Sequence, residues 1–347
     1  MKKIVKTIFT CFGCFIGIII IIFASLMLFG NGNVSLPVAK KDVYQVDNKV
    51  KYAQSLYAKD NKILNESGEQ ILLKGIMVPD ARKLDKDDDF NEEYFERVFE
   101  SGGNVIRIPV HPNEWVDDEY YLWRYLDPIV TWAVEHNKYV IIDLHFIGNI
   151  ETGIGSEMAD VKMNPYDFSI KFWNTVASYF KDVPNVIFEI YNEPAAITGE
   201  AWIKCANSLV KTIRKTEANQ LILVSGIDYS YDLSCWENDP LEDANIAYTA
   251  HIFPNRSGWE QKFESIAATL PIVVTEWGYA SENGLAKQTY LKGNRESYGE
   301  PIVHFMGEHN MGWTACWYDD GWEPQMFFEG MKEMTDWGMF VMEQLKK

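Results

Sequence analysis

Two glutamates, Glu193 and Glu276, each follow a short run of apolar, mostly β-branched residues. Burying an unpaired carboxylate is costly, so a carboxylate at the end of a buried strand usually has a partner or a chemical task. Two such carboxylates at one site fit glycoside hydrolysis, in which one acid protonates the leaving oxygen and one carboxylate meets the developing oxocarbenium ion. At a separation of about 5–5.5 Å the second carboxylate attacks directly, and the anomeric configuration is retained.

The neighbours of the two glutamates suggest which role each takes. Glu193 is expected to rest as the protonated acid, because the negative charge of Glu276 and limited solvent disfavour a second charge. Glu276 is expected to stay ionised beside the cationic Arg107 and to act as the nucleophile. Asn192 is placed to hydrogen-bond the 2-hydroxyl of a sugar, and Trp317 offers a flat face to the sugar ring.

Four other polar residues follow or lie within similar runs. Arg107 and His145 are candidate site residues, but each has a structural alternative, as an ion-pair partner and as a hydrogen-bonded core histidine respectively. His251 is a candidate at the end of another run. Glu189 lies four residues before Glu193, so strand alternation puts both on one face at different depths. We interpret Glu189 as an acid of the barrel interior that pairs with Arg107.

Eight short apolar runs are the elements that must position these residues. They begin near Leu72, Asn104, Tyr139, Val186, Leu221, Asn245, Pro271 and Gly312. Such runs are typical of strands buried on both faces, and amphipathic stretches of helical period separate most of them. The pattern predicts a (β/α)8 TIM barrel with its active site at the carboxyl ends of the strands. An open doubly wound sheet is the alternative, which the lack of a glycine-rich phosphate turn after the first run disfavours.

The chain is expected to contain one domain, residues 53–347, after a spacer at residues 31–52. Turn residues at Asp60-Asn61 and at Ser67-Gly68 predict a short β-hairpin that covers the N-terminal end of the barrel. Residues 1–30 contain lysines at positions 2, 3 and 6 and an uncharged apolar run, Ile8 to Phe29. That run is long enough to cross a bilayer and longer than the core of a cleaved signal, which is about 7–15 residues.

The N-terminal segment therefore predicts an uncleaved membrane anchor whose lysines stay in the cytoplasm. A cleaved signal peptide is the alternative, since Gly30 and Gly32 are small residues near a conceivable cut. In both cases the domain is expected outside the cytoplasm, anchored to the cell membrane or secreted.

Composition limits the kind of partner. With 32 basic and 50 acidic residues, the chain carries a net charge of −18 at pH 7. A chain this acidic repels phosphate, so we expect no nucleic-acid partner. Aromatic residues make up 14% of the chain, which hints at a ligand that stacks on rings. Four tryptophans and a histidine follow runs and are candidate ring contacts, with packing at the barrel rim as the alternative: Trp115, Trp236, Trp277, Trp322 and His111.

The spacing of the cysteines and histidines predicts neither a set of stabilising disulfide bonds nor a metal site. Cys205, Cys235 and Cys316 allow at most one disulfide. No two histidines have the spacing of a metal-binding helix, so we expect no metal and no cofactor. The acidic run at residues 85–96 lacks the pattern of a calcium loop and is interpreted as a solvated loop that places acids at a helix N-terminus.

An ordered set of short motifs resembles glycoside hydrolase family 5, the cellulase family of retaining β/α-barrel glycosidases. The motifs are Ile106-Arg107-Ile108-Pro109, Asp143-Leu144-His145, Tyr191-Asn192-Glu193-Pro194, His251, Thr275-Glu276-Trp277-Gly278 and Trp317. The resemblance runs from about Leu56 to the C-terminus. It implies that Glu193 is the acid/base and Glu276 the nucleophile. It also implies that sugar and nucleophile are positioned by Arg107, His145, Asn192, His251 and Trp317.

One position departs from the family. A tyrosine usually lies two residues after the histidine of the sixth strand, and here Phe253 takes its place without a hydroxyl.

The resemblance implies a retaining endo-β-1,4-glucanase that acts on a polysaccharide or oligosaccharide. Mannan, xyloglucan and mixed-linkage glucan remain alternative substrates. A barrel that binds carbohydrate with weak catalysis is a further alternative, which Phe253 motivates.

Overall fold

The computed structural model describes residues 38–155, 161–243, 245–281 and 286–347. Contacts divide the chain into two units, Met1–Ala39 and Lys40–Lys347, and every helix and strand described below belongs to the second. The predicted anchor or signal at residues 1–30 lies outside the described residues. Within the described ranges, no helix combines the length and the apolar character needed to cross a membrane.

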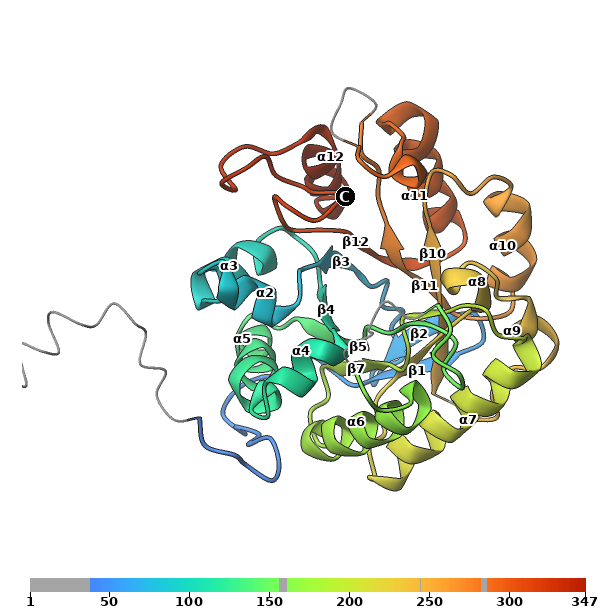
Figure 1. The fold of residues 1–347 in the computed structure, drawn as a ribbon. Coiled ribbons are helices and arrows are strands. Elements are labelled where there is room, and N and C mark those ends of the chain that lie inside the picture. Colours follow the sequence, from blue (N-terminus) through green and yellow to red (C-terminus); the bar gives the residue numbers. More distant parts are fainter. Residues whose placement is uncertain (1–37, 156–160, 244, 282–285) are drawn as a thin grey trace, which may run out of the picture. The chain divides into compact units, whose positions relative to one another are not determined.

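Eight parallel strands close into a barrel, as the eight apolar runs predict (Figure 1). Around the barrel they lie in chain order: β3 (Lys74–Met77), β4 (Val105–Val110), β5 (Tyr139–Leu144), β7 (Val186–Glu189), β9 (Ile222–Ser225), β10 (Ile246–Ile252), β11 (Ile272–Trp277) and β12 (Gly312–Ala315). Almost every residue of these strands is buried, because the barrel interior covers one face and the helices cover the other. The doubly wound alternative is thereby excluded.

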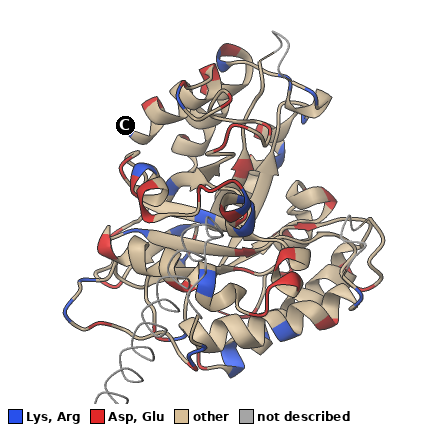
Figure 2. Cartoon of the chain, turned by 60° about the vertical axis from the view of Figure 1, so that its left-hand side comes forward, with Lys and Arg blue, Asp and Glu red and all other residues tan. Residues whose placement is uncertain are grey.

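Helices surround the barrel, and the longer ones form its outer layer (Figure 1). They are α2 (Ala81–Lys86), α3 (Glu92–Phe99), α4 (Pro112–Asp117), η1 (Leu122–Leu126), α5 (Asp127–Glu135), α6 (Pro165–Phe180), α7 (Gly199–Lys215), α8 (Ile227–Ser230), α9 (Ser234–Asn238), α10 (Trp259–Ala267), η2 (Thr289–Leu291), η3 (Arg295–Gly299), α11 (Glu300–Glu308) and α12 (Asp336–Leu345). Helix α7 begins where the Thr198 side chain accepts a hydrogen bond from the backbone of Ala201, and its buried face includes Trp202 and Leu209. Acidic and basic residues are interspersed over the helices in Figure 2.

The predicted hairpin covers one end of the barrel. Strands β1 (Leu56–Lys59) and β2 (Lys62–Asn65) pair antiparallel around the turn at Asp60, whose φ is 53°. Leu56 and Ile63 join a buried cluster with the first residues of several barrel strands, among them Val105 and Tyr139. Because those residues begin their strands, the hairpin closes the N-terminal end and leaves the carboxyl end for the site.

A β-bulge in β11 distinguishes the carboxyl end of the barrel. The register between β10 and β11 pairs Ala250 with Val274 and then His251 with Glu276, so Thr275 is the extra residue. A bulge of this kind directs two consecutive side chains toward one residue of the neighbouring strand. Two short strands, β6 (Ile147–Gly148) and β8 (Glu193–Pro194), pair in parallel above the barrel and fix the segment that carries Glu193.

Candidate active site

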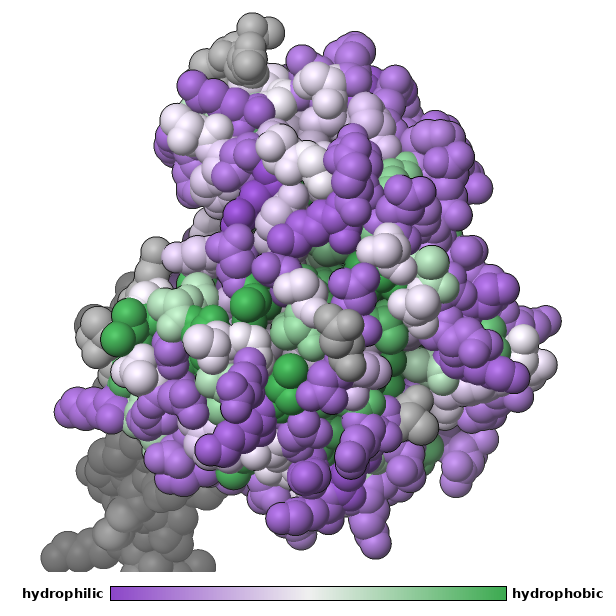
Figure 3. Space-filling model, turned by 90° about the vertical axis from the view of Figure 1, so that its right-hand side faces the viewer, coloured by the Kyte–Doolittle hydropathy of each residue, from purple (hydrophilic) through white to green (hydrophobic). Residues whose placement is uncertain are grey.

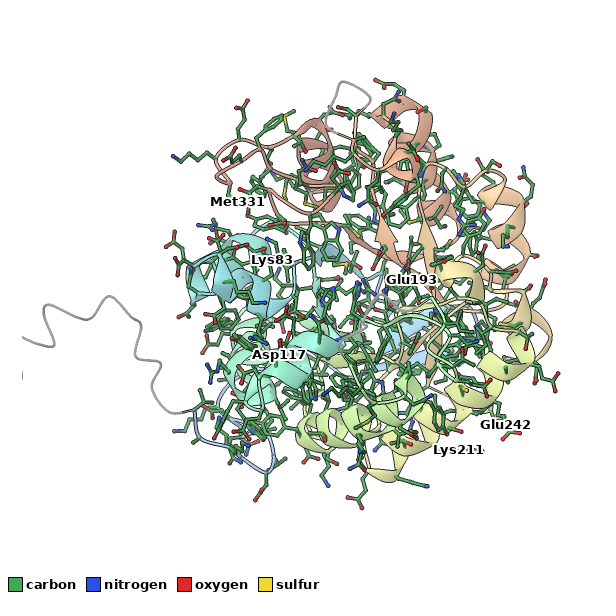
Figure 4. All side chains as sticks on the ribbon, viewed as in Figure 1. Lys83, Asp117, Glu193, Lys211, Glu242 and Met331 are labelled. Atoms are coloured by element: carbon green, nitrogen blue, oxygen red, sulfur yellow. The ribbon has the colours of Figure 1, made fainter. Side chains whose placement is uncertain are left out.

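A cavity of about 800 Å³ opens at the carboxyl ends of the strands. Six predicted site residues line it: Glu193, Glu276, His145, Asn192, His251 and Trp317. Glu193 lies near the middle of the ring of strands in Figure 4, whereas Lys211 and Glu242 lie at its outer edge. The outline in Figure 3 is hollowed at its left edge, which is the side that faces the reader in Figure 1.

Arg107, the seventh predicted residue, lies beneath the cavity and is fully buried. Its Nε lies 2.6 Å from Oε2 of Glu189, which confirms the predicted pair, and its Nη1 lies 2.8 Å from Oε1 of Glu276. Its Nη2 lies 3.0 Å from Oδ2 of Asp143. Burial alone disfavours the charge of Arg107, but these three carboxylates hold its pKa well above the usual value. Arg107 therefore stays cationic and anchors Glu276.

His251 lies between the two candidate catalytic carboxylates. Its Nδ1 is 2.7 Å from Oε1 of Glu193 and 3.7 Å from Oε2 of Glu276, and its Nε2 is 3.2 Å from Oγ1 of Thr275. The bulge in β11 explains how Thr275 and Glu276 both reach one imidazole. Burial lowers the pKa of His251 to about 4, although the charge of Glu276 opposes this shift, so the ring is neutral near pH 7.

Asp143 and His145 form a second buried pair. Nδ1 of His145 lies 2.6 Å from Oδ2 of Asp143. Burial raises the pKa of Asp143 to about 6, although Arg107 pulls it down. Burial and the neighbouring His111 lower the pKa of His145 well below its usual value. A neutral His145 donates its Nδ1 proton to Asp143, which fixes the ring at the wall of the cavity.

The amide of Asn192 is oriented by Arg107. Nη2 of Arg107 donates to Oδ1 of Asn192 at 2.7 Å, which identifies the other end of the amide as the NH2 group. Within the described part of the chain, that Nδ2 is buried and has no hydrogen-bond partner. A buried donor without a partner is costly, so Asn192 is prepared to donate to a ligand in the cavity.

Aromatic and imidazole rings form one wall of the cavity. The ring of Trp317 lies 5.0 Å from that of Trp322 and 6.2 Å from that of His145. His111 lies 4.5 Å from His145 and 5.4 Å from Trp322, and it lines the cavity as well.

The other three candidate tryptophans pack elsewhere. Trp236 and Trp277 are fully buried in the core. Trp115 packs edge-on against Phe172 and does not line this cavity. In the sequence, these three tryptophans and Trp322 share only a place at or after the end of a strand. The sequence therefore does not show which of the four lines the cavity.

Seven further residues line the cavity, and no motif in the sequence pointed to them: Tyr229, Asn255, Arg256, Lys287, Gln288, Tyr290 and Glu323. Phe253 lines the cavity too, and its ring meets that of Tyr290 edge-on at 5.4 Å. Burial raises the pKa of Tyr290, and the charges of Glu276 and Glu193 add to the shift. These residues lie in loops and in the short helical segments α8 and η2, where the sequence has no periodicity that predicts their path.

The three cysteines of the described domain form no disulfide bond. Cys205, Cys235 and Cys316 are all free. The acidic run ends α2 and begins α3, with Glu92 and Glu93 in the first turn of α3, as predicted.

Glu193, His251 and Glu276 bring their ligand atoms within 4.8 Å of one another, and these are donor types that a metal accepts. The absence of a metal remains a prediction for this trio.

A closed parallel barrel with two close carboxylates at the carboxyl ends of its strands defines a β/α-barrel glycoside hydrolase. A sequence profile of one family, described as cellulase (glycosyl hydrolase family 5), matches residues 64–320. The chain therefore belongs to glycosyl hydrolase family 5.

Two curated relatives are similar over part of their length. An endoglucanase of Clostridium saccharobutylicum is 29% identical over 223 residues, which are 61% of this chain and 46% of that protein. Endoglucanase Z of Dickeya dadantii is 27% identical over 222 residues, or 62% and 47% of the two chains. The chain thus spans about half the length of these relatives.

Solved structures cover the barrel more fully. The β-glucanase SdGluc5_26A of Saccharophagus degradans aligns with a TM-score of 0.83 at 25% identity, over 90% of this chain and 99% of that one. The same β-glucanase in complex with cellotetraose aligns with a TM-score of 0.82 over 91% and 100% of the two chains.

Proposed function

We propose that this protein is a retaining β-glucanase that cuts β-1,4-glucan by two displacements, with Glu193 as acid/base and Glu276 as nucleophile. The observation that carries the proposal is the spacing of the two carboxylates, whose closest oxygens lie within 4.8 Å of each other. Retaining glycosidases place the two groups about 5–5.5 Å apart, whereas inverting ones leave about 6.5–9.5 Å for a water molecule.

The contacts of each glutamate support its role. Glu276 lies 2.8 Å from the cationic Arg107, which favours the ionised form that attacks the anomeric carbon. Glu193 faces a neutral imidazole nitrogen instead. In the first step Glu193 protonates the leaving oxygen while Glu276 forms the glycosyl ester. In the second step Glu193 takes a proton from water, and that water releases the sugar from Glu276.

The remaining predicted residues hold the sugar and the nucleophile. The free Nδ2 of Asn192 donates to the 2-hydroxyl, a contact that strengthens in the transition state. Trp317 offers its ring to the sugar, and His145 bounds the same wall. Arg107 acts through Glu276 and is a positioning residue. The endoglucanase names of two relatives and the cellotetraose bound to SdGluc5_26A support a β-glucan substrate.

A panel of soluble polysaccharides tests the proposal. Wild-type protein is expected to release reducing ends and short oligosaccharides from carboxymethyl-cellulose, faster than from mannan, xyloglucan or mixed-linkage glucan. Faster release from another polysaccharide of the panel would contradict the proposed substrate but not the proposed two-displacement mechanism. Glu193→Ala and Glu276→Ala serve as controls, since both are expected to slow release by at least about 10².

Phe253 favours a second candidate, a barrel that binds carbohydrate with weak catalysis, because no hydroxyl is available at that position. A binder gains nothing from two close carboxylates, which supports the enzyme. Binding of carboxymethyl-cellulose without release of reducing ends would favour the binder.

We also propose that the domain works outside the cytoplasm, with residues 1–30 as a membrane anchor or a cleaved signal. The mass of the mature protein in the membrane and medium fractions of expressing cells distinguishes the two. A full-length chain that fractionates with cytoplasm would contradict both.

A further inference from the structure

A lysine on α2 contacts the aromatic wall of the cavity without lining the cavity itself. Nζ of Lys83 donates to Oδ2 of Asp87 at 2.8 Å and to Oδ1 of Asp319 at 2.9 Å. The same Nζ lies over the ring of Trp322, 5.6 Å from the centroid, which is within the range of a cation–π contact. Trp322 lines the cavity and Lys83 does not. Lys83 therefore acts on this wall and not on the space for a ligand.

Asp319 connects the lysine to the backbone that carries Trp322. Asp319 is almost fully buried, and its Oδ2 accepts from the backbone N–H of Gly321 at 3.2 Å and of Trp322 at 2.7 Å. The backbone N–H of Asp319 donates to the carbonyl oxygen of Trp317 at 2.8 Å. One carboxylate oxygen thus fixes the turn of Trp322 and the other binds Lys83. The loop after β12 is thereby joined to the helix after β3.

This ion pair is shielded from most of the solvent. The side chain of Lys83 is 21% exposed and that of Asp319 is 6% exposed. Burial alone would lower the pKa of Lys83, but the hydrogen bonds to Asp87 and Asp319 raise it above its usual value. Lys83 is therefore cationic near pH 7. A buried carboxylate that loses its cation is costly, so removal of this charge is expected to loosen the turn at Asp319.

The position of Trp322 selects one side of the scissile bond. Strand β12 lies opposite β7 in the ring of eight strands, and Glu193 follows β7. The acid must lie beside the oxygen of the departing sugar, so a ring across the barrel from Glu193 meets the sugars that stay on Glu276. Trp317, whose ring lies 5.0 Å from that of Trp322, is proposed above to contact the first of these sugars. Trp322 is then left for the second one.

We propose that Lys83 and Asp319 are positioning residues that hold the ring of Trp322 at the cavity wall, where it binds the second sugar of the glycosyl group retained on Glu276. This inference rests on the proposed glucanase function and deepens it. Neither positioning residue touches the substrate. Their contribution is to fix beforehand a ring that would otherwise lose rotational freedom when the sugar binds.

The kinetics of β-cellobiosyl fluoride test the pair, because this donor offers two sugars to the retained side and loses only a fluoride ion. We expect Lys83→Met to raise KM about three- to tenfold and to keep kcat within about twofold, since a sugar remote from the reacting bond is bound equally in the ground state and the transition state. Lys83→Arg keeps a cation and is expected to restore most of the wild-type KM. Lys86→Met is the matched control, because it removes a cation from the same helix that pairs with Glu114 and not with Asp319. It is expected to keep the wild-type KM.

A double-mutant cycle with Trp322→Ala shows whether the lysine acts through the ring. Once the ring is absent, Lys83→Met is expected to change KM by less than about twofold. Asp319→Asn keeps an oxygen for the two backbone donors but loses the ion pair, so it should raise KM as Lys83→Met does. Turnover of the fluoride at the wild-type kcat reports that each variant is folded.

Three results would overturn the proposal: a wild-type KM in both Lys83→Met and Asp319→Asn, a fall in kcat at unchanged KM, or an equal rise in KM with and without the ring of Trp322. Wild-type protein that releases neither fluoride from this donor nor reducing ends from carboxymethyl-cellulose would show that the glucanase function itself fails. That result is distinct from failure of the positioning pair.

Discussion

Nδ1 of His251 lies 2.7 Å from Oε1 of Glu193, and hydrogen bonds on the far side of the ring determine which of the two atoms holds the proton. Glu189 accepts from Arg107 at 2.6 Å and, as a carboxylate, accepts the hydroxyl proton of Thr275 at 2.8 Å. Thr275 has then only a lone pair for Nε2 of His251, so Nε2 carries the ring proton. Nδ1 is left as an acceptor, and the proton between the ring and Glu193 belongs to Glu193.

Removing the hydroxyl of Thr275 should therefore change the pH dependence of the acid. In Thr275→Val the ring is free to carry its proton on Nδ1 and to donate to an ionised Glu193. We expect the alkaline limb of the kcat/KM profile on cellotetraose to move to lower pH. Thr275→Ser keeps the hydroxyl and is expected to keep the wild-type profile. Superimposable profiles for valine and wild type would show that Thr275 has no part in holding the proton.

The effect of removing the acid Glu193 on the rate should depend on the leaving group of the substrate. Glu193→Ala is expected to slow cleavage of cellotetraose by about 10²–10⁴, the usual contribution of general acid catalysis. Formation of the glycosyl ester from β-cellobiosyl fluoride should be affected much less, because fluoride needs no proton to leave. Azide, which needs no general base, should speed release of the ester in this variant. A Glu193→Ala variant that cleaves cellotetraose like wild type would contradict the assignment.

Arg107 should be irreplaceable by lysine. The three guanidinium nitrogens of Arg107 each contact a different carboxylate, on Asp143, Glu189 and Glu276. The single ammonium nitrogen of a lysine lacks this planar arrangement of donors and cannot replace all three contacts. Leaving buried carboxylates without their partner costs about 3–5 kcal/mol, so Arg107→Lys should lower the free energy of unfolding by that order in urea titrations. Arg97→Lys, at an exposed pair with Glu93, should lower it by less than about 1 kcal/mol. Equal effects would contradict the account.

The buried His251 should make the fold less stable in acid. Its pKa is about 4 in the folded protein and about 6.5 in the unfolded chain, so between these values only the unfolded state binds the proton. Its contribution is lost as the pH falls from about 6.5 to about 4 and amounts to about 3 kcal/mol. Asp143, with a folded-state pKa of about 6, acts in the opposite sense over an overlapping range.

Comparison of variants isolates the histidine from Asp143. In His251→Gln the free energy of unfolding should fall less steeply with acidification than in wild type, by about 3 kcal/mol over that range. His304→Gln removes an exposed histidine and should leave the wild-type slope. Parallel curves for His251→Gln and wild type would show that the ring is not buried in its neutral form.

The barrel and its two glutamates were predictable because burial on both faces leaves a direct record in the sequence. All eight strands lie within the predicted runs. Strand alternation marked Glu189 as an acid of the barrel interior, and it pairs with Arg107. A carboxylate in such a run is conspicuous for the same reason. The hairpin was predictable from turn residues that tolerate a positive φ, as Asp60 shows.

The finer parts of the site were not predictable because they depend on departures from regular geometry. Alternation puts Thr275 and Glu276 on opposite faces, and only the bulge brings both to His251. Tyr229 and Tyr290 lie on α8 and η2, which the sequence does not distinguish from the intervening loops. Trp322 follows β12 and Trp277 ends β11, yet Trp322 lines the cavity and Trp277 is buried in the core.

The identity of the nucleophile is the central claim, and a trapped intermediate tests it most directly. A 2-deoxy-2-fluoro-β-cellobiosyl fluoride keeps a good leaving group but slows the second step, so the glycosyl ester accumulates on the attacking residue. Peptide mapping by mass spectrometry should find the added sugar on Glu276 and nowhere else. A sugar attached to Glu193 or to another residue, or no adduct in a protein that turns over cellotetraose, would contradict the account.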